Sequence, residues 1–197
     1  MKFVILLLAG YLLGCVNFSI ILTKRLEKKD VRDFGSGNAG FTNTLRNFKR
    51  KTAVMVFAGD ALKAVVAVLL AKLLMPGNQY AMFAASLGTI LGHNFPVFYG
   101  FRGGKGVLVS VVGIFFTDYR IGFIVLIGSV FIMFATGYVS LGSLSGASLF
   151  PILTAIVHTL QAEYIVFAVL IALLNIFMHR SNIVRLAHGK ENCFKKH

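Results

Sequence analysis

The chain has 197 residues, of which 57% are hydrophobic and only 14% are charged, and its mean hydropathy is +0.79. Soluble domains carry about 25% charged residues, so this composition excludes a water-soluble globular protein and indicates an integral membrane protein. The net charge of +13 leaves nucleic acid, anionic lipid and phosphorylated substrates as candidate partners.

Long apolar runs predict an all-α protein, a polytopic transmembrane bundle of about seven spans that forms one domain over residues 1–197. The first run is longer than the apolar part of a signal peptide and lacks a clear cleavage site, so we expect a retained helix. The fourth run is too short to cross a bilayer, which keeps five and six spans as alternatives. The expected spans are Phe3–Thr23, Thr52–Met75, Tyr80–Phe95, Val107–Phe116, Ile121–Gly137, Val139–His158 and Tyr164–Met178.

The basic residues predict which side of the membrane each loop occupies. Sixteen of the twenty Lys and Arg fall in residues 24–51, at Arg102 and Lys105, and in the tail 180–196. Seven spans put all three groups on one side, which the positive-inside rule makes cytoplasmic. The N-terminus then lies outside and the C-terminus in the cytoplasm. For much of this charge, topology alone is a sufficient explanation.

The first polar segment, residues 33–46, combines three glycines with several hydrogen-bond donors. Gly35, Gly37 and Gly40 permit positive φ and close backbone approach, so that consecutive N–H groups can form an anion-binding nest. A flexible hydrophilic loop is the alternative, but it does not need so many small donors. The donors suited to phosphate are the side chains of Ser36, Asn38, Thr42, Asn43 and Arg46.

The second segment, residues 92–106, resembles a Walker loop only in part. That motif needs glycine at position 99 and Ser or Thr at position 106, where this chain has Tyr99 and Gly106. A nucleotide-hydrolysis function is therefore not supported. The remaining candidates for binding an oxyanion or phosphate are Gly103 and Gly104, the cations Arg102 and Lys105, and His93 and Asn94, for which interfacial polar residues are the alternative.

The third segment, residues 179–192, leaves the last span directly. His179 and Asn182 are three residues apart and share a face if the helix continues. Glu191 is the only acid in the tail, and we expect it to pair with a nearby cation. The alternative is a basic amphipathic tail that lies on anionic lipid.

Polar residues also occur inside the expected spans. Asp60 and Lys63 are intramembrane charges, which are costly and mark either a functional interior or mutual neutralisation at i,i+3. Asn17, Ser19 and Asn175 are interpreted as interhelical hydrogen-bonding residues. The small residues of the sixth span predict close helix packing, and the two cysteines, which show no metal-ligand spacing, are expected to be free thiols.

Four strings carry the polar residues of the three segments: GSGNAGFTNTLR at 35–46, GHNFP at 92–96, RGGKGV at 102–107 and HRSNIVRL at 179–186. These strings closely resemble the bacterial acyl phosphate:glycerol-3-phosphate acyltransferases, small integral enzymes of the inner membrane, and the resemblance covers nearly the whole chain. It implies transfer of a fatty acyl group from acyl phosphate to glycerol 3-phosphate. The products would be 1-acyl-glycerol 3-phosphate (lysophosphatidic acid) and phosphate, in the first step of phospholipid synthesis.

The resemblance implies an active site that faces the cytoplasm and binds two phosphate-bearing substrates. We expect Arg46 and Lys105 to bind phosphate and stabilise charge, with Ser36 in the first donor cradle and Gly103 and Gly104 in the second. His179 and Asn182 would orient the attacking hydroxyl. The base is either His179 or a substrate phosphate. Further substrate contacts are expected from Gly35, Gly37, Asn38, Gly40, Thr42, Asn43, His93, Asn94, Arg102 and Glu191.

Two other functions compete with this assignment. An anion transporter would show repeated halves and polar residues reaching both faces, whereas these motifs share one face and no repeat is visible. A non-catalytic membrane scaffold would need only charge, not a donor-rich loop. The expected partners are acyl phosphate, glycerol 3-phosphate and membrane lipid, with no nucleic acid, no obligatory protein partner, no metal and no cofactor.

Overall fold

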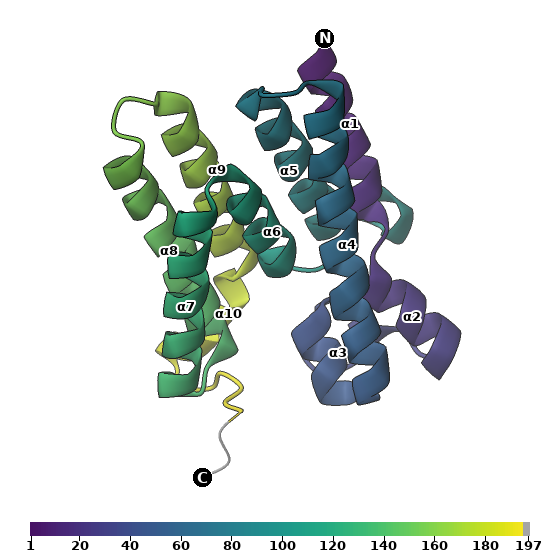
Figure 1. Cartoon of the computed structure of the whole chain (residues 1–197). Coiled ribbons are helices and arrows are strands. Elements are labelled where there is room, and N and C mark those ends of the chain that lie inside the picture. The colour runs from purple at the N-terminus through teal and green to yellow at the C-terminus, as the bar shows by residue number, and fades with distance from the viewer. Residues whose placement is uncertain (195–197) are drawn as a thin grey trace. The chain divides into compact units, whose positions relative to one another are not determined.

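The computed structural model describes residues 1–194, and within that range every regular element is helical (Figure 1). This confirms the all-α prediction. The chain divides into two compact units, residues 1–117 and the residues from 118 onward. The first unit contains α1 (Lys2–Cys15), α2 (Phe18–Glu27), the 3-10 turn η1 (Val31–Asp33), α3 (Phe41–Asn47), α4 (Arg50–Leu74), α5 (Gln79–Asn94), η2 (Val97–Tyr99) and α6 (Val107–Thr117), and the second contains α7 (Tyr119–Thr136), α8 (Val139–Val157), α9 (Ala162–Met178) and α10 (Arg180–Ala187).

Each of the seven predicted spans is helical, with boundaries within a few residues of those expected. Four helical segments are long and apolar enough to cross a membrane: α1 with α2 (Lys2–Glu27), α4, α7 and α8. The pair α9 and α10, bent by 60°, makes a fifth, and α6 is a shorter apolar helix, as predicted. The protein therefore has four or five membrane-spanning candidates by length and composition, and a count of seven stays a prediction.

Helices α1 and α5 approach each other backbone to backbone through glycines. Gly10 and Gly14 on α1, and Gly88 and Gly92 on α5, are spaced four residues apart and share a face. A β-carbon at any of the four would overlap backbone atoms of the opposite helix. Small residues permit such contact where apolar lipid gives helices little reason to associate.

The first span is interrupted between α1 and α2 because Asn17 starts a new helix. Its Oδ1 accepts a hydrogen bond from Ile20 N at 3.1 Å, which caps α2. Its Nδ2 donates to Ala39 O at 3.2 Å, which joins the break to the first polar loop. In addition, the Ser19 hydroxyl lies 2.6 Å from that of Thr44 and links α2 to α3. The predicted interhelical role of Ser19 is thereby confirmed.

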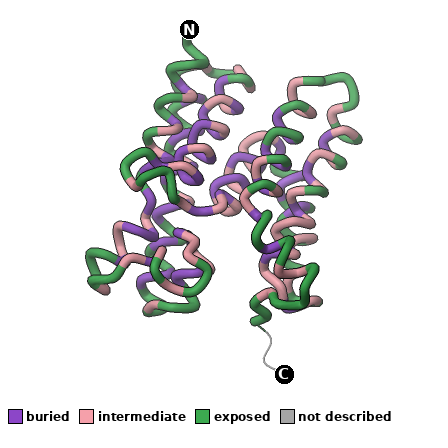
Figure 2. Tube along the Cα trace, turned by 180° about the vertical axis from the view of Figure 1, so that it is seen from behind, coloured by how far each residue is buried: buried purple, intermediate pink, exposed green. Residues whose placement is uncertain are grey.

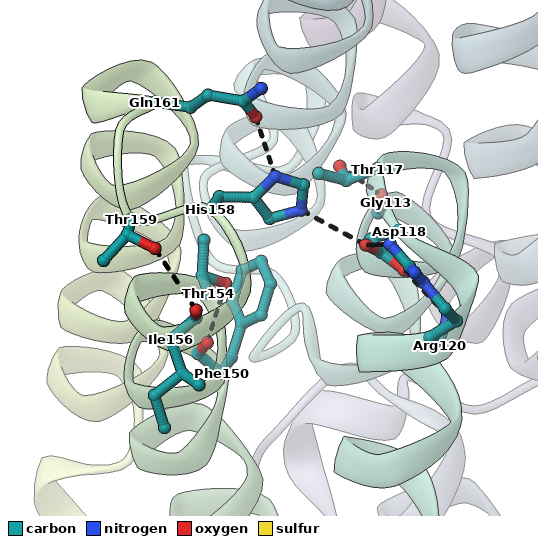
Figure 3. A network of polar contacts seen from close by, with 10 residues as sticks. All are labelled: Gly113, Thr117, Asp118, Arg120, Phe150, Thr154, Ile156, His158, Thr159 and Gln161. Carbon is teal, nitrogen blue, oxygen red and sulfur yellow. Dashed lines mark hydrogen bonds and ion pairs between the residues drawn. The ribbon is translucent and has the colours of Figure 1, made fainter.

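In the second unit, α7 and α8 pack through the small residues predicted for the sixth span. A β-carbon at Gly142 would lie 2.5 Å from Ser129 O, and one at Gly146 would overlap the Ser129 hydroxyl. A hydrogen bond links the turn after α8 to the start of α7: His158 Nε2 lies 3.2 Å from Asp118 Oδ2 (Figure 3). The other ring nitrogen lies 2.7 Å from Gln161 Oε1.

Buried positions form stripes along the helices of each unit, and the remaining faces are exposed (Figure 2). Many exposed side chains are large and apolar, including Leu8 on α1, Leu73 on α4 and Phe131 on α7. Exposed apolar faces of this extent are expected of helices whose neighbours are lipid tails.

Candidate functional site

The first polar loop is organised from within by the buried side chain of Asn43. Its Nδ2 donates to Val31 O at 3.1 Å and to Phe34 O at 2.9 Å. Its Oδ1 accepts from Ser36 N at 3.1 Å and from Asn47 Nδ2 at 3.0 Å. Because these bonds engage both amide atoms, Asn43 positions the loop that presents Ser36.

Two of the three glycines in this loop have the positive φ that the sequence predicted. Gly35 has a φ of 58° and Gly37 a φ of 70°, whereas Gly40 is extended. At Gly35 there is also no room for a side chain, since a β-carbon would lie 2.5 Å from Asn43 Oδ1 and Asn47 Nδ2. The Ser36 side chain that follows is exposed.

The second loop is held close to the end of α5 by backbone contacts. Gly103 N donates to Asn94 O at 3.2 Å, and Gly104 N donates to His93 O at 3.0 Å. A β-carbon at Gly103 would overlap His93 O, and one at Gly104 would overlap His93 Nε2. These two glycines are thus required for close approach, a different role from that of the positive-φ residue Gly106.

The two glycine loops meet within the first unit. Ala39 N, in the first loop, donates to Gly103 O, in the second, at 3.3 Å. Arg32 adds a further tie by donating to Tyr99 O at 2.8 Å, while its guanidinium pairs with Asp30 at 2.8 Å. Hydrogen bonding from Arg32 holds the pKa of Asp30 well below its usual range despite the opposing effect of burial. Arg32 and Asp30 were not among the predicted site residues.

The predicted cations flank this junction in sequence. Arg46 is exposed in the last turn of α3, and Lys105 is half-buried just before α6. Arg102 is exposed, while Thr42 and Asn38 are half-buried. A pair of glycine loops with hydroxyl, amide and cationic groups offers a phosphate or oxyanion several donors without a metal.

Asn94, the last residue of α5, contacts the second loop and is 1% exposed. A β-carbon at Gly106 would lie 2.6 Å from Asn94 Oδ1. Within residues 1–194, neither its Nδ2 nor its Oδ1 has a hydrogen-bond partner. An unsatisfied buried amide costs about 1–3 kcal/mol, so Asn94 stays a candidate substrate contact.

A buried charged cluster on α4 lies beside His93. Lys63 Nζ lies 2.7 Å from Asp60 Oδ1, as the i,i+3 spacing predicted, and 3.0 Å from His93 Nδ1. The same ammonium also donates to the carbonyls of Gly14 and Val16, at 3.0 and 2.8 Å. Lys63 therefore does more than neutralise Asp60.

The third segment belongs to the second unit, where the chain bends at His179 between α9 and α10. The last span ends at Met178, as predicted, and the helix does not continue straight through His179, which was the condition for His179 and Asn182 to share one helical face. Both residues are buried. His179 Nδ1 lies 2.8 Å from Asn175 O. Because a carbonyl can only accept, Nδ1 carries a proton, and in the neutral ring Nε2 holds the lone pair.

Glu191 gathers three donors in the second unit. Its Oε1 accepts from Asn182 Nδ2 at 2.8 Å and from Ser140 Oγ at 3.0 Å, and its Oε2 accepts from Arg185 Nε at 2.8 Å. Burial raises the pKa of this carboxyl, but the bonds from Asn182, Arg185 and Ser140 together lower the pKa below its ordinary value. Pairing with a cation is confirmed. Because both oxygens already accept bonds, this geometry favours positioning Asn182 over contacting an anionic substrate.

The structure thus brings the first two segments together and organises the third internally. In the first unit, sequence reasoning missed Arg32, which joins the loops. It singled out Asn17 and Lys63 as polar residues of the spans, but not their partners, which are the first loop for Asn17 and His93 for Lys63. For Lys63, its burial in an apolar span was the available signal. Among residues 1–194, no three His, Cys, Asp or Glu side chains gather in a way that would hold a metal ion.

Comparisons with known proteins cover nearly the whole chain. Residues 4–189 match the family model of glycerol-3-phosphate acyltransferase. The chain is 47% identical to a glycerol-3-phosphate acyltransferase of Thermoanaerobacter pseudethanolicus, over 93% of this chain and 91% of the relative. It is 41% identical to one of Halalkalibacterium halodurans, over 95% of this chain and 93% of the relative.

Solved structures give the same result for the fold. The crystal structure of PlsY (YgiH), an integral membrane glycerol 3-phosphate acyltransferase in its glycerol 3-phosphate form, matches with a TM-score of 0.88 and 33% identity. That match covers 99% of this chain and 96% of PlsY. The lysophosphatidic acid form of PlsY matches with a TM-score of 0.85 and 32% identity.

Proposed function

Because the chain belongs to the glycerol-3-phosphate acyltransferase family, we propose that it acylates glycerol 3-phosphate with an acyl phosphate as donor. It is a membrane acyltransferase of lipid synthesis. The proposed products are 1-acyl-glycerol 3-phosphate and inorganic phosphate. The acceptor and this product are supported by the two forms in which PlsY has been crystallised, with glycerol 3-phosphate and with lysophosphatidic acid.

The observation that carries the site assignment is the junction of the two glycine loops through Ala39 N and Gly103 O. Both substrates are phosphate-bearing, and this junction lies between the segments that supply Arg46 and Lys105. We assign these cations to phosphate binding and charge stabilisation. The exposed Ser36 hydroxyl supplies a neutral donor. The predicted nest of backbone donors is not available at Gly37 and Gly104, because their N–H groups already donate to Phe34 O and His93 O.

The chemistry requires no cofactor because an acyl phosphate is already activated. The glycerol hydroxyl oxygen attacks the carbonyl carbon, and the resulting oxyanion is stabilised by the donors of the site. The intermediate collapses with cleavage of the bond between the carbonyl carbon and the phosphate oxygen, and phosphate departs with that electron pair. We assign His179 and Asn182 to orienting the hydroxyl. The hydroxyl proton passes to His179 Nε2 or to a phosphate oxygen.

We also propose a topology of seven spans in the bacterial cytoplasmic membrane, with the active site facing the cytoplasm. The distribution of the basic residues supports this orientation. The count is supported because each of the seven apolar runs is helical, the first as the interrupted pair α1 and α2. In this topology the shorter helices α5 and α6 cross among their neighbours.

The direct test supplies purified protein in detergent with palmitoyl phosphate and radiolabelled glycerol 3-phosphate. Labelled lysophosphatidic acid should form, equally with and without chelator, and acyl-CoA or acyl carrier protein should give little product. Arg46→Ala and Lys105→Ala should each lower kcat/KM by about 100-fold or more, whereas Lys51→Ala, which removes an exposed lysine, should not. Efficient turnover with acyl-CoA would exclude the proposed donor, and full activity of Lys105→Ala would exclude the site.

A further inference from the structure

The buried cluster on α4 has a geometry that assigns every hydrogen of the Lys63 ammonium. The side chains of Lys63 and Asp60 are only 4% and 3% exposed, so the two charges must be balanced inside the protein. An ammonium has three donors and no acceptor. Its three hydrogen-bond partners are Gly14 O, Val16 O and His93 Nδ1, at 2.8–3.0 Å. Asp60 Oδ1, at 2.7 Å, balances the charge but meets no hydrogen-bond geometry within the described residues, and it lies 3.6 Å from His93 Nδ1, beyond hydrogen-bonding distance.

This arrangement determines which nitrogen of His93 carries the proton. Since the ammonium can only donate, Nδ1 of His93 must accept, and the proton of the neutral ring sits on Nε2. A second proton on Nδ1 would face the Lys63 ammonium at 3.0 Å, whereas the nearest carboxylate oxygen, Asp60 Oδ1, lies farther away at 3.6 Å, so the charged ring is opposed. His93 is therefore held as a neutral ring with its N–H at Nε2.

The Nε2 edge of His93 faces the junction of the two glycine loops. A β-carbon added to Gly104 would overlap Nε2 and would lie 2.8 Å from Ala39 O. Glycine at 104 is what leaves room for the ring edge. The N–H group thus lies where the first and second loops meet.

The break in the first span supports the same junction from two sides. The carbonyls of Gly14 and Val16, at the end of α1, bind Lys63. Asn17, the next residue, donates to Ala39 O at 3.2 Å. The interruption between α1 and α2 therefore positions two groups of the junction: the Ala39 carbonyl through Asn17, and the ring of His93 through Lys63.

We propose that Lys63 is a positioning residue of the active site: it locks His93 in the Nε2–H tautomer, so that His93 donates a fixed hydrogen bond to a substrate phosphate or to the carbonyl oxyanion. The substrate half of this proposal rests on the proposed function, whereas the tautomer half does not. Lys63 lies outside all three polar segments, and it acts on the site only through His93 and the break in the first span.

The tautomer is tested without substrate, by NMR of protein labelled with ¹⁵N-histidine. The His93 signals are assigned by their loss in His93→Gln, and the wild type should show a single proton on Nε2. The double variant Asp60→Leu with Lys63→Met removes both charges together and leaves no side-chain donor for His93 Nδ1 at either position, and apolar replacements of similar size are often tolerated at buried ion pairs. In it, the Nε2–H tautomer should no longer be the sole form. A wild-type His93 protonated on Nδ1, or on both nitrogens, would overturn the proposal.

The contribution to catalysis is tested by kinetics on folded, monodisperse protein. His93→Phe should lower kcat by about 100-fold, as expected for removal of one oxyanion donor. The double variant should lower kcat in the same direction, and Lys72→Gln, on the exposed face of the same helix, should leave it unchanged. If the wild type turns over acyl phosphate but His93→Phe keeps its kcat and KM, the proposed contact is wrong. If the wild type acylates no glycerol 3-phosphate, the proposed function fails, and the NMR result alone decides the tautomer.

Discussion

Replacing Asn43 with alanine should disorder the loop that presents Ser36 while leaving the helices intact. The substitution removes four hydrogen bonds: two donated to Val31 O and Phe34 O, and two accepted from Ser36 N and Asn47 Nδ2. The lost amide is buried, so solvent replaces these partners poorly.

The size of the effect follows from the number of bonds. A hydrogen bond contributes about 0.5–1.5 kcal/mol net, so four bonds of which some are replaced by water represent about 2–4 kcal/mol of local stability. A factor of ten in an equilibrium corresponds to about 1.4 kcal/mol. If only the ordered loop binds phosphate, the apparent affinity falls with the ordered fraction. The KM for glycerol 3-phosphate should therefore rise by at least about tenfold.

Steady-state kinetics at varied glycerol 3-phosphate distinguish this loop effect from a chemical role. In Asn43→Ala, kcat should be largely retained at saturation because bound substrate restores the ordered loop. Asn43→Asp keeps the acceptor for Ser36 N but turns a carboxylate toward two carbonyl oxygens, so it should be at least as damaging. Asn47→Ala is the matched control, because Asn47 is exposed and its loss removes only one of the four bonds of the Asn43 side chain. The KM of this control should change much less than that of Asn43→Ala. A KM within about twofold of wild type for Asn43→Ala would refute the reasoning, given the energies above.

Three further outcomes are expected. Glu191→Gln should lower kcat/KM by about tenfold, because an amide NH₂ group replaces one of the two accepting oxygens and must then face a hydrogen-bond donor. Glu163→Gln is the control, and equal effects of the two substitutions would count against a positioning role for Glu191. The pKa of Asp118 is lowered to about 2, chiefly by its hydrogen bond with Arg120, so its contribution, about 1 kcal/mol after screening, is complete above about pH 4 and lost as the pH falls toward 2. Thermal melting should therefore drop less steeply with acid in Asp118→Asn than in wild type, and parallel curves would exclude this linkage. In intact cells that express the protein without Cys15 and Cys193, an impermeant thiol reagent should label Asn78→Cys but not Ala187→Cys. Labelling of both would contradict the seven-span topology.

The helices were predictable because their signals are local. Each apolar run became a helix, and turn residues such as Gly137, which has a φ of 80°, ended helices near the expected positions. The glycine loops were also recognisable, since tolerance of positive φ, which Gly35 and Gly37 adopt, is a property of glycine itself. Sequence spacing likewise predicted the Asp60–Lys63 pair, whose members are one helical turn apart.

The roles of individual polar side chains were decided by tertiary structure. Asn43 and Glu191 resemble substrate contacts in sequence, but three-dimensional packing gives each a set of partners within its own unit. The bend at His179 likewise depends on where α9 ends, which a periodic pattern does not specify. Hydrogen bonding is short-ranged and directional, so the partner of a donor depends on folded geometry and not on residue type.

The sequence by itself determined that this is a helical membrane acyltransferase with two glycine loops and three basic segments, because hydrophobicity, glycine conformation and motif strings are written along the chain. Only the tertiary structure decided that Lys63, 30 residues before His93, faces its Nδ1 and also binds the carbonyls at the break of the first span. Contacts between residues far apart in sequence arise when α1, α4 and α5 pack together. In that packing a buried charge must find every partner it needs, since lipid and apolar side chains offer none.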